Sequence, residues 1–207
     1  MGSIMIKDEL SLSIVGTCGR GEDYDKLNLS KYEEMYRVAD KLIEYINSKS
    51  PTPLTHLVSG GAAFSDHLAV RLYLNNRIPN LKLYLPCAYE NGEFTDDDIF
   101  GRIASTANWY HSQFEKETGQ NSLKEIQLAI DKGADVTVIN GFKNRNTYVS
   151  MSHYILAMTF GEKDKVKDGG TWDTINKYLY RIKEESLTDN SFHYNLNEMK
   201  MYKGCKI

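Results

Sequence analysis

The chain has 207 residues, of which 41% are hydrophobic and 26% are charged, and this composition predicts one globular domain over residues 1–207 rather than a disordered chain. The formal net charge of −3, with no long Lys/Arg run, does not favour nucleic acid as a partner. No apolar run reaches the ~18 residues of a membrane-spanning helix, and residues 1–9 lack the apolar core of a signal peptide. We therefore expect a cytoplasmic protein without a membrane partner, in the host cytoplasm if the protein is viral.

In the first half of the chain, short β-rich runs alternate with helical patterns. Ser30 and Glu33 have the spacing of a capping box and predict the start of the first helix. A second helical pattern follows Gly60-Gly61, and Pro86 stops the third strand. The predicted strands of this half are residues 10–16, 54–59 and 81–85. This alternation is typical of the α/β class with a Rossmann-like parallel sheet flanked by helices.

The second half is less regular. Residues 88–98 are polar and acidic, and we interpret about residues 88–132, which include the two helices that follow, as a helical insertion or lid. The run 154–160 is the most apolar of the chain and predicts a buried central strand. The other predicted elements are a loop over 17–28, helices over 103–117 and 122–132, a strand over 136–139, a helical turn over 146–151, a helix after Gly169-Gly170-Thr171 and an edge strand over 192–196.

Three glycine loops stand just after predicted strands: Gly16-Thr17-Cys18-Gly19-Arg20-Gly21, Gly60-Gly61 and Gly169-Gly170-Thr171. The carboxyl ends of parallel strands share one edge of a sheet, where ligands bind at the switch point of strand order. Glycine lets backbone N–H groups approach a phosphate, and a helix that starts there adds its positive end. Each loop alone can be a tight turn without a ligand. Together they predict a phosphate pocket bordered by Gly16, Gly60, Gly61, Gly170 and Thr171.

Charged residues near these loops each have two interpretations. Arg145, beside Asn146, can clamp a phosphate with its planar guanidinium or form a surface ion pair. Asp173 can face the ligand or simply complement the positive end of a helix. Asp66 can bind ribose hydroxyls or be another acidic residue at a helix start.

The cysteines, histidines and aromatic residues give weaker signals. The three cysteines are far apart, which predicts thiols in a reducing compartment, although Cys18 can line the pocket. The five histidines lack metal-ligand spacing, so we expect neither a metal nor a cofactor. The aromatic cluster can stack on a base or pack in the core; its members are Trp109, Tyr110, His111 and Phe114.

In combination, these motifs resemble the SLOG superfamily. The resemblance spans about residues 10–185 and rests on Gly16 to Arg20, Gly60-Gly61 with Asp66 and Ala69, Arg145-Asn146, Phe160-Gly161, and Gly169 to Thr174. The superfamily includes Lonely Guy phosphoribohydrolases, DprA-like proteins and nucleotide-sensor domains, and this chain looks most like the YspA-type branch. The resemblance implies a ligand site formed by Gly16, Thr17, Cys18, Arg20, Gly60, Gly61, Asp66, Arg145, Asn146, Gly169, Gly170, Thr171, Asp173 and Thr174.

The resemblance implies two alternative functions. The protein can bind a nucleotide-derived ligand, ADP-ribose-like or a cyclic nucleotide signal, for sequestration or sensing. Alternatively, it can be a phosphoribohydrolase that cleaves the base–ribose bond, with Asp173 stabilising the charge on ribose and Arg145 holding phosphate. Asp173 lies two residues past Thr171, whereas the glutamate of Lonely Guy enzymes lies three past the threonine, and this favours the binder. Related folds often pair, so a homodimer is a further expectation.

Overall fold

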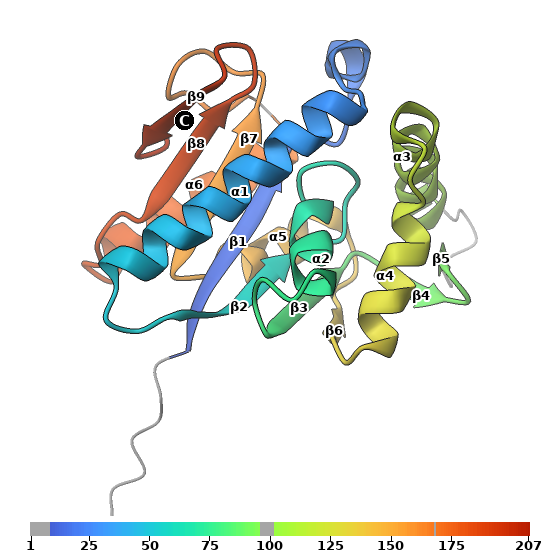
Figure 1. The fold of residues 1–207 in the computed structure, drawn as a ribbon, viewed down its shortest axis with the longest axis horizontal. Helices are drawn as coiled ribbons and strands as arrows, with labels where there is room; N and C mark the ends of the chain where they lie inside the picture. Colours follow the sequence, from blue (N-terminus) through green and yellow to red (C-terminus); the bar gives the residue numbers. More distant parts are fainter. Residues whose placement is uncertain (1–8, 96–101, 168) are drawn as a thin grey trace, which may run out of the picture.

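The computed structural model describes residues 9–95, 102–167 and 169–207, and a seven-stranded sheet forms its centre (Figure 1). The strand order is β6-β3-β2-β1-β7-β8-β9. All neighbouring strands are parallel except β8 and β9, which are antiparallel. The strands are β1 (Leu10–Gly16), β2 (Leu54–Ser59), β3 (Asn80–Leu85), β6 (Asp135–Val138), β7 (Tyr154–Thr159), β8 (Ser191–Asn195) and β9 (Lys200–Lys203). The expected Rossmann-like α/β fold is confirmed.

Helices cover both faces of this sheet (Figure 1). On one face lie α1 (Leu29–Lys49) and α2 (His67–Leu74), and on the other lie α5 (Phe142–Val149) and α6 (Gly170–Glu184). Leu12 and Ile14 of β1 belong to the buried cluster under α1 and α2, whereas Val15 belongs to the cluster under α5 and α6. Because successive strand side chains point to opposite faces, β1 is covered on both sides, as parallel strands generally are.

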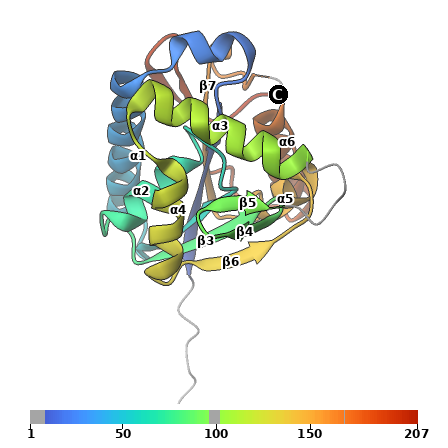
Figure 2. The same ribbon diagram turned by 90° about the vertical axis from the view of Figure 1, so that its right-hand side faces the viewer.

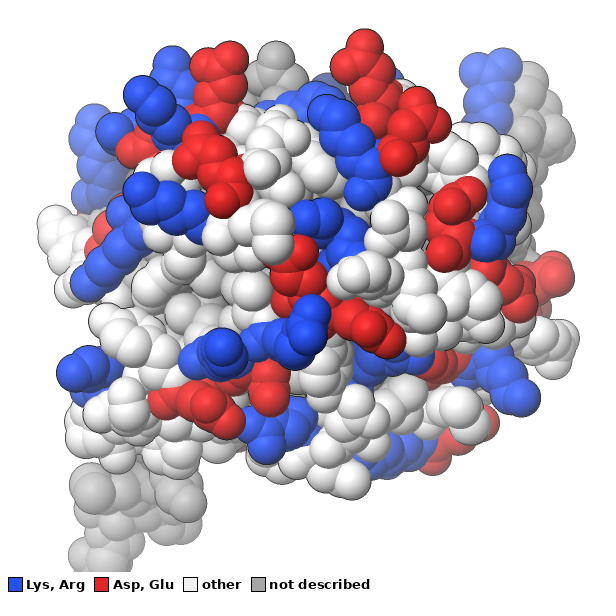
Figure 3. All heavy atoms as spheres, turned by 45° about the horizontal axis from the view of Figure 1, so that its top comes forward, with Lys and Arg blue, Asp and Glu red and all other residues white. Residues whose placement is uncertain are grey.

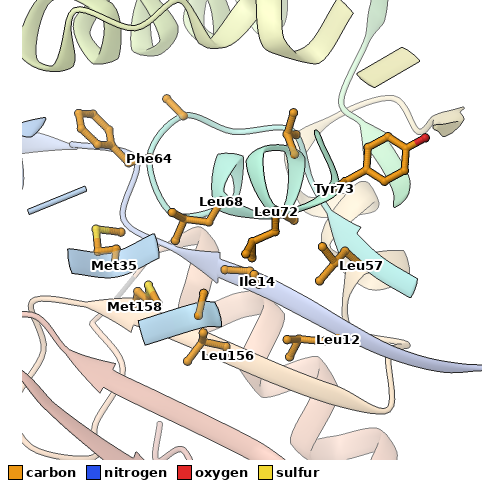
Figure 4. Close-up of a cluster of buried hydrophobic side chains, with 14 of the residues drawn as sticks. Leu12, Ile14, Met35, Leu57, Phe64, Leu68, Leu72, Tyr73, Leu156 and Met158 are labelled. Carbon is orange, nitrogen blue, oxygen red and sulfur yellow. The ribbon is translucent and has the colours of Figure 1, made fainter. Parts of the chain in front are cut away.

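The larger core cluster joins β1, β2 and β7 to α1 and α2 (Figure 4). Ile14, Met35, Leu57, Leu68 and Leu156 are all fully buried in it. Burial of such side chains contributes about 1.5–3 kcal/mol each. This packing fixes the central strands, and it therefore fixes the position of the loops that leave their carboxyl ends.

Residues 88–95 and 102–132 form a hairpin and two helices beside the main sheet. The hairpin strands β4 (Ala88–Glu90) and β5 (Glu93–Thr95) are antiparallel, and Asn91-Gly92 makes the turn between them. The two predicted helices are confirmed as α3 (Arg102–Thr118) and α4 (Ser122–Asp131). Figure 2 shows α3 crossing this side of the molecule, while α4 packs against α2.

The start of α1 corrects the predicted capping box. The helix begins at Leu29, and Asn28 is its N-cap. The side-chain oxygen of Asn28 accepts a hydrogen bond from the N–H of Lys31 at 2.9 Å. Asn caps a helix as well as Ser does, so the earlier residue starts the helix and Ser30 lies inside its first turn.

The C-terminal edge of the sheet also differs from the prediction. The predicted edge strand corresponds to β8, which is internal because β9 pairs with its outer side. The predicted helical turn over 146–151 belongs to the longer helix α5, whose start follows Gly141 with a positive φ of 89°. The loop predicted over 17–28 contains a short 3-10 helix, η1 (Gly21–Lys26). Residues 96–98, which the sequence assigns to a polar stretch, lie outside the described residues.

Candidate ligand-binding site

A cleft lies at the carboxyl edge of the sheet, at the point where strand order reverses. The chain passes from β1 to β2 on one side, and β7 later pairs with the other side of β1. Thr17, just after β1, and Thr159, at the end of β7, line the same cleft. This crevice between diverging connections is the usual ligand site of open α/β sheets.

The cleft has two adjoining parts. The smaller part, the polar lobe, has a volume of about 460 Å³, and its polar side chains include Thr17, Asp23, Thr159, Lys167 and Thr174. The larger part, the aromatic lobe, has a volume of about 680 Å³. Its apolar lining includes Ala63, Pro86, Ala107, Tyr110, Phe142 and Trp172. Seven residues line both lobes and form what we call the waist: Cys18, Arg20, Ala62, Arg145, Asn146, Gly169 and Gly170.

All the ligand-site residues predicted from the sequence lie along this cleft. The polar lobe contains Gly16, Thr17, Asp66, Thr171 and Thr174, and the aromatic lobe contains Gly60, Gly61 and Asp173. The waist contains Cys18, Arg20, Arg145, Asn146, Gly169 and Gly170. The three glycine loops therefore meet at one edge of the sheet, as the alternation of strands and helices predicts, while ligand binding by these residues stays a prediction.

Arg145 is the buried centre of the waist. The residue is only 8% exposed, so the interpretation as a surface ion pair is wrong. Its Nε donates to Asn146 Oδ1 at 3.1 Å, its Nη1 donates to the Gly60 carbonyl, and Nη1 lies 3.6 Å from Asp66 Oδ2. Among the described residues, Nη2 has no hydrogen-bond partner. Burial lowers the pKa of Arg145 and the Asp66 carboxylate opposes this shift, but arginine stays charged at any physiological pH.

Asp66 faces inward and holds Arg145. Burial raises the pKa of its carboxyl, while Arg145 and the backbone of Ala62, Gly60 and Gly16 favour the charged form. A Cβ on Gly60 would collide with the Arg145 guanidinium and lie 2.8 Å from an Asp66 oxygen. Glycine is thus needed at position 60 because the ion pair packs against the backbone there. The Asp66 carboxylate is already engaged within the protein.

The three glycine loops differ in the N–H groups that they leave available. The N–H of Gly61 donates to Ser59 Oγ at 3.0 Å, and that of Gly19 donates to Thr17 Oγ1 at 3.1 Å. In contrast, the N–H groups of Gly170 and Thr171 have no partner within the described residues, and Gly169 gives α6 no side-chain cap. The start of α6 is therefore the loop that offers backbone donors to an anion.

Asn146 connects Arg145 to Asp173. Its Nδ2 donates to Asp173 Oδ2 at 3.0 Å and lies 3.3 Å from the Gly170 carbonyl oxygen. Lys177 Nζ also lies 2.8 Å from Asp173 Oδ2, one helical turn along α6. Asp173 thus lines the aromatic lobe with one carboxylate oxygen already held by two donors, and it also stands in the first turn of α6.

The predicted aromatic cluster divides between the cleft and the core. Tyr110 lines the aromatic lobe, whereas Phe114 is fully buried and Trp109 is 53% exposed. His111 also lines the lobe, but its Nε2 pairs with the Gly61 carbonyl at 3.0 Å and its Nδ1 with Ser122 Oγ at 2.7 Å. Burial lowers the pKa of His111 to about 3, so this ring is neutral and braces α3 against the second glycine loop.

Sequence reasoning missed two aromatic residues of the cleft. Phe142 of α5 and Trp172 of α6 join Tyr110 and His111 of α3, so three helices supply aromatic rings to the lobe. Each of the two stands in the first turn of a helix: Phe142 directly follows Gly141, and Trp172 lies two residues after Gly170. An aromatic residue within two positions of a glycine at a helix start was the available signal.

An ion pair in the polar lobe was also missed. Asp23 Oδ1 lies 2.5 Å from Lys167 Nζ, and Asp23 Oδ2 accepts from Thr17 Oγ1 at 2.8 Å. Asp23 is 5% exposed. The pair joins η1 to the loop before α6 across a sequence separation of 144 residues, so local patterning gives no signal for it.

The cleft contains a cysteine, Cys18, but the described residues contain no candidate metal site. Cys18 lies at the waist, and burial raises the pKa of its thiol to about 11, which leaves it protonated at neutral pH. None of the described cysteines forms a disulfide. In the described part of the chain, no group of three or more His, Cys, Asp or Glu side chains could hold a metal ion.

The surface toward the carboxyl edge carries both charge signs. Figure 3 shows Lys and Arg interspersed with Asp and Glu across this view, without a continuous basic area. Of the helices within residues 9–95, 102–167 and 169–207, none is long and apolar enough to cross a membrane.

The fold and the cleft define a Rossmann-like α/β protein with a two-lobed crevice at the switch point of its sheet. No family model matches the chain. A protein of Acanthamoeba polyphaga mimivirus, Uncharacterized protein R261, is 35% identical to it over 178 residues, which are 84% of this chain and 94% of that protein. The chain belongs to the same family as this mimivirus protein.

Proposed function

We propose that this protein binds a nucleotide-derived ligand, ADP-ribose-like or a cyclic nucleotide signal, as a sequestering or sensing protein of the SLOG type. The observation that carries the proposal is the waist. At the waist and its border with the polar lobe, Arg145 Nη2 and the N–H groups of Gly170 and Thr171 face the same cleft, and none of them has a hydrogen-bond partner among the described residues. A pre-oriented guanidinium together with an uncapped helix start is a phosphate site in many proteins.

The aromatic lobe suits the base of such a ligand. Tyr110, Phe142 and Trp172 offer flat apolar surface next to the waist, and aromatic side chains stack on bases with little sequence preference. Arg20 is exposed, lines both lobes, and has no ion-pair partner among the described residues, so it is a second cation for the phosphate.

Cleavage of the base–ribose bond is the alternative function. Asp173 favours it, because its carboxylate, which pairs with Lys177, lies where the aromatic lobe meets the waist. A carboxylate there could stabilise positive charge on the ribose. We favour binding because both hydrogen bonds to Oδ2 of Asp173 tie it to α5 and α6.

Calorimetric titration with AMP, ADP, ADP-ribose and 3′,5′-cyclic AMP tests the proposal, and denaturation followed by mass analysis of the ligand tests the alternative. A binder returns intact nucleotide. An enzyme releases free base, and Asp173→Asn should then slow product formation by about 10²-fold or more, the size of a general acid–base contribution. In a binder the same variant changes only affinity.

We further propose that the protein acts in the cytoplasm, in the host cell if it is viral. The mimivirus relative is in keeping with a viral role, and three cysteines without a disulfide suit a reducing compartment. Sequestration predicts that the protein holds its ligand without turnover. Addition of the purified protein to a nucleotide solution should therefore lower the free concentration stoichiometrically.

A further inference from the structure

The polar lobe contains a group of side chains to which the proposed function assigns no role. Asp23, Thr17 and Lys167 lie together at its wall, joined by the two contacts of the Asp23 carboxylate. Thr17 comes from the loop after β1, Asp23 from η1 and Lys167 from the loop before α6. The lobe is separate from the aromatic lobe and meets it only at the waist.

This group keeps both acceptors and donors available. An ionised carboxylate accepts about four hydrogen bonds and an ammonium donates three. Within the described residues, Asp23 accepts one bond at each oxygen and Lys167 Nζ donates one. About two further acceptor positions on Asp23 and two donors on Lys167 therefore remain, which suffices for a pair of neighbouring hydroxyls, since each hydroxyl both donates and accepts.

The charge of the lobe argues against a second phosphate there. Three acidic side chains (Glu22, Asp23 and Asp66) and three basic ones (Arg20, Arg145 and Lys167) line it, so their formal charges cancel. The cationic donors that are not paired with a carboxylate among the described residues are the Arg20 guanidinium and Arg145 Nη2, and both belong to the waist. A neutral polyol fits the lobe better than an anion does, because Asp23 repels negative charge and accepts from hydroxyls.

We propose that Asp23, Thr17 and Lys167 form a subsite for the hydroxyls of a sugar. The ligand is then a nucleoside diphosphate whose second phosphate carries that sugar, with the base in the aromatic lobe and the diphosphate at the waist. This inference rests on the proposed function and selects, among nucleotide-derived ligands, those with a sugar at both ends.

Calorimetry of ADP-ribose against ADP tests this subsite, because ADP-ribose carries a terminal ribose where ADP has a free and more negatively charged β-phosphate. The wild-type protein should bind ADP-ribose roughly tenfold or more tightly than ADP, the effect of one hydrogen bond to a charged group. Asp23→Asn and Lys167→Met should each bring this ratio close to one and leave ADP affinity unchanged. Asp25→Asn is the matched control, since Asp25 is exposed on the same 3-10 helix and does not line the cleft.

The outcomes separate the subsite from the proposed function. Unchanged ADP affinity in Asp23→Asn shows that the cleft remains folded, and Lys167→Met leaves the buried carboxylate in place. A wild-type ratio near one, or a raised ratio that survives both variants, overturns the sugar subsite while nucleotide binding stands. A gain in ADP affinity in Asp23→Asn also overturns it, because the lobe is then an anion site. Absence of binding by both nucleotides overturns both proposals.

Discussion

The two lobes of the cleft are built by different means. The polar lobe forms where strand ends and loops meet, and its charged groups are arranged in advance by the Asp66–Arg145 and Asp23–Lys167 pairs. The aromatic lobe forms between α3, α5 and α6, which all supply aromatic rings to it. Fixed polar partners suit the phosphate and sugar parts of the proposed ligand, whereas a flat apolar lobe tolerates different bases. Specificity should therefore reside in the polar lobe and the waist.

Arg145→Ala should have the largest effect, because Arg145 serves both lobes. It leaves Asp66 buried without its partner, which costs about 3–5 kcal/mol of stability for a broken buried pair. It should also weaken nucleotide binding by roughly 1.5–3 kcal/mol. Urea unfolding and calorimetry measure the two losses.

Two further variants control this prediction. Arg145→Lys should restore part of the affinity, because lysine keeps the charge but lacks the planar fork. Arg77→Ala removes a partly exposed arginine that pairs with Asp40 and Glu44, and it should leave binding unchanged. Equal affinity in wild type and Arg145→Ala would remove Arg145 from the ligand site.

Gly60→Ala should have an intermediate effect, since the added methyl collides with the Arg145 guanidinium. Crowding of this kind typically costs about 1–3 kcal/mol. The loss of stability should be smaller when the change is made in the Arg145→Ala background, where the colliding group is absent. Chemical denaturation of the single and double variants measures this coupling. Additive losses would show that Gly60 is not required by the arginine.

Acidification should have the smallest effect, and it should act on the aromatic lobe. Burial lowers the pKa of His111 to about 3, while an unfolded histidine binds a proton near pH 6.5. The unfolded state therefore binds more protons between these values, so the stability contributed by neutral His111 is complete above pH 6.5 and declines toward pH 3. From pH 7.5 to 5.5 the loss should be about 1 kcal/mol.

The matched variant for this pH effect is His111→Gln, which cannot titrate. Its unfolding free energy should change less between pH 7.5 and 5.5 than that of the wild type, measured by urea denaturation at both values. The remaining change is expected from His67, His193 and His56, whose pKa values burial also lowers. An identical pH dependence in both proteins would contradict the neutral, buried state of His111.

The sequence predicts the polar lobe better than the aromatic one. Strand–helix alternation places the carboxyl ends of β1, β2 and β7 at one edge, so the glycine loops and Arg145 could be assigned to one cleft. Phe142 and Trp172 enter it because of the way α5 and α6 pack, which periodicity does not encode. The Asp23–Lys167 pair joins distant segments and gives no local signal. Likewise, the sequence predicts that the N–H group of Gly61 faces a phosphate, but this group donates to Ser59 Oγ instead, because of the geometry of the loop.

Fluorescence of Trp172 tests most directly that a nucleotide lies with its base in the aromatic lobe and its phosphate at the waist. The chain has two tryptophans, so Trp109→Phe leaves Trp172 as the sole reporter. We predict a saturable change in Trp172 emission on titration with ADP, at the affinity found by calorimetry, and its loss in Arg145→Ala. Ribose 5-phosphate, which lacks a base, should compete with ADP without the same change. Calorimetric binding of ADP with unaltered Trp172 emission would contradict the proposed orientation, and no binding of any nucleotide would contradict the proposed function itself.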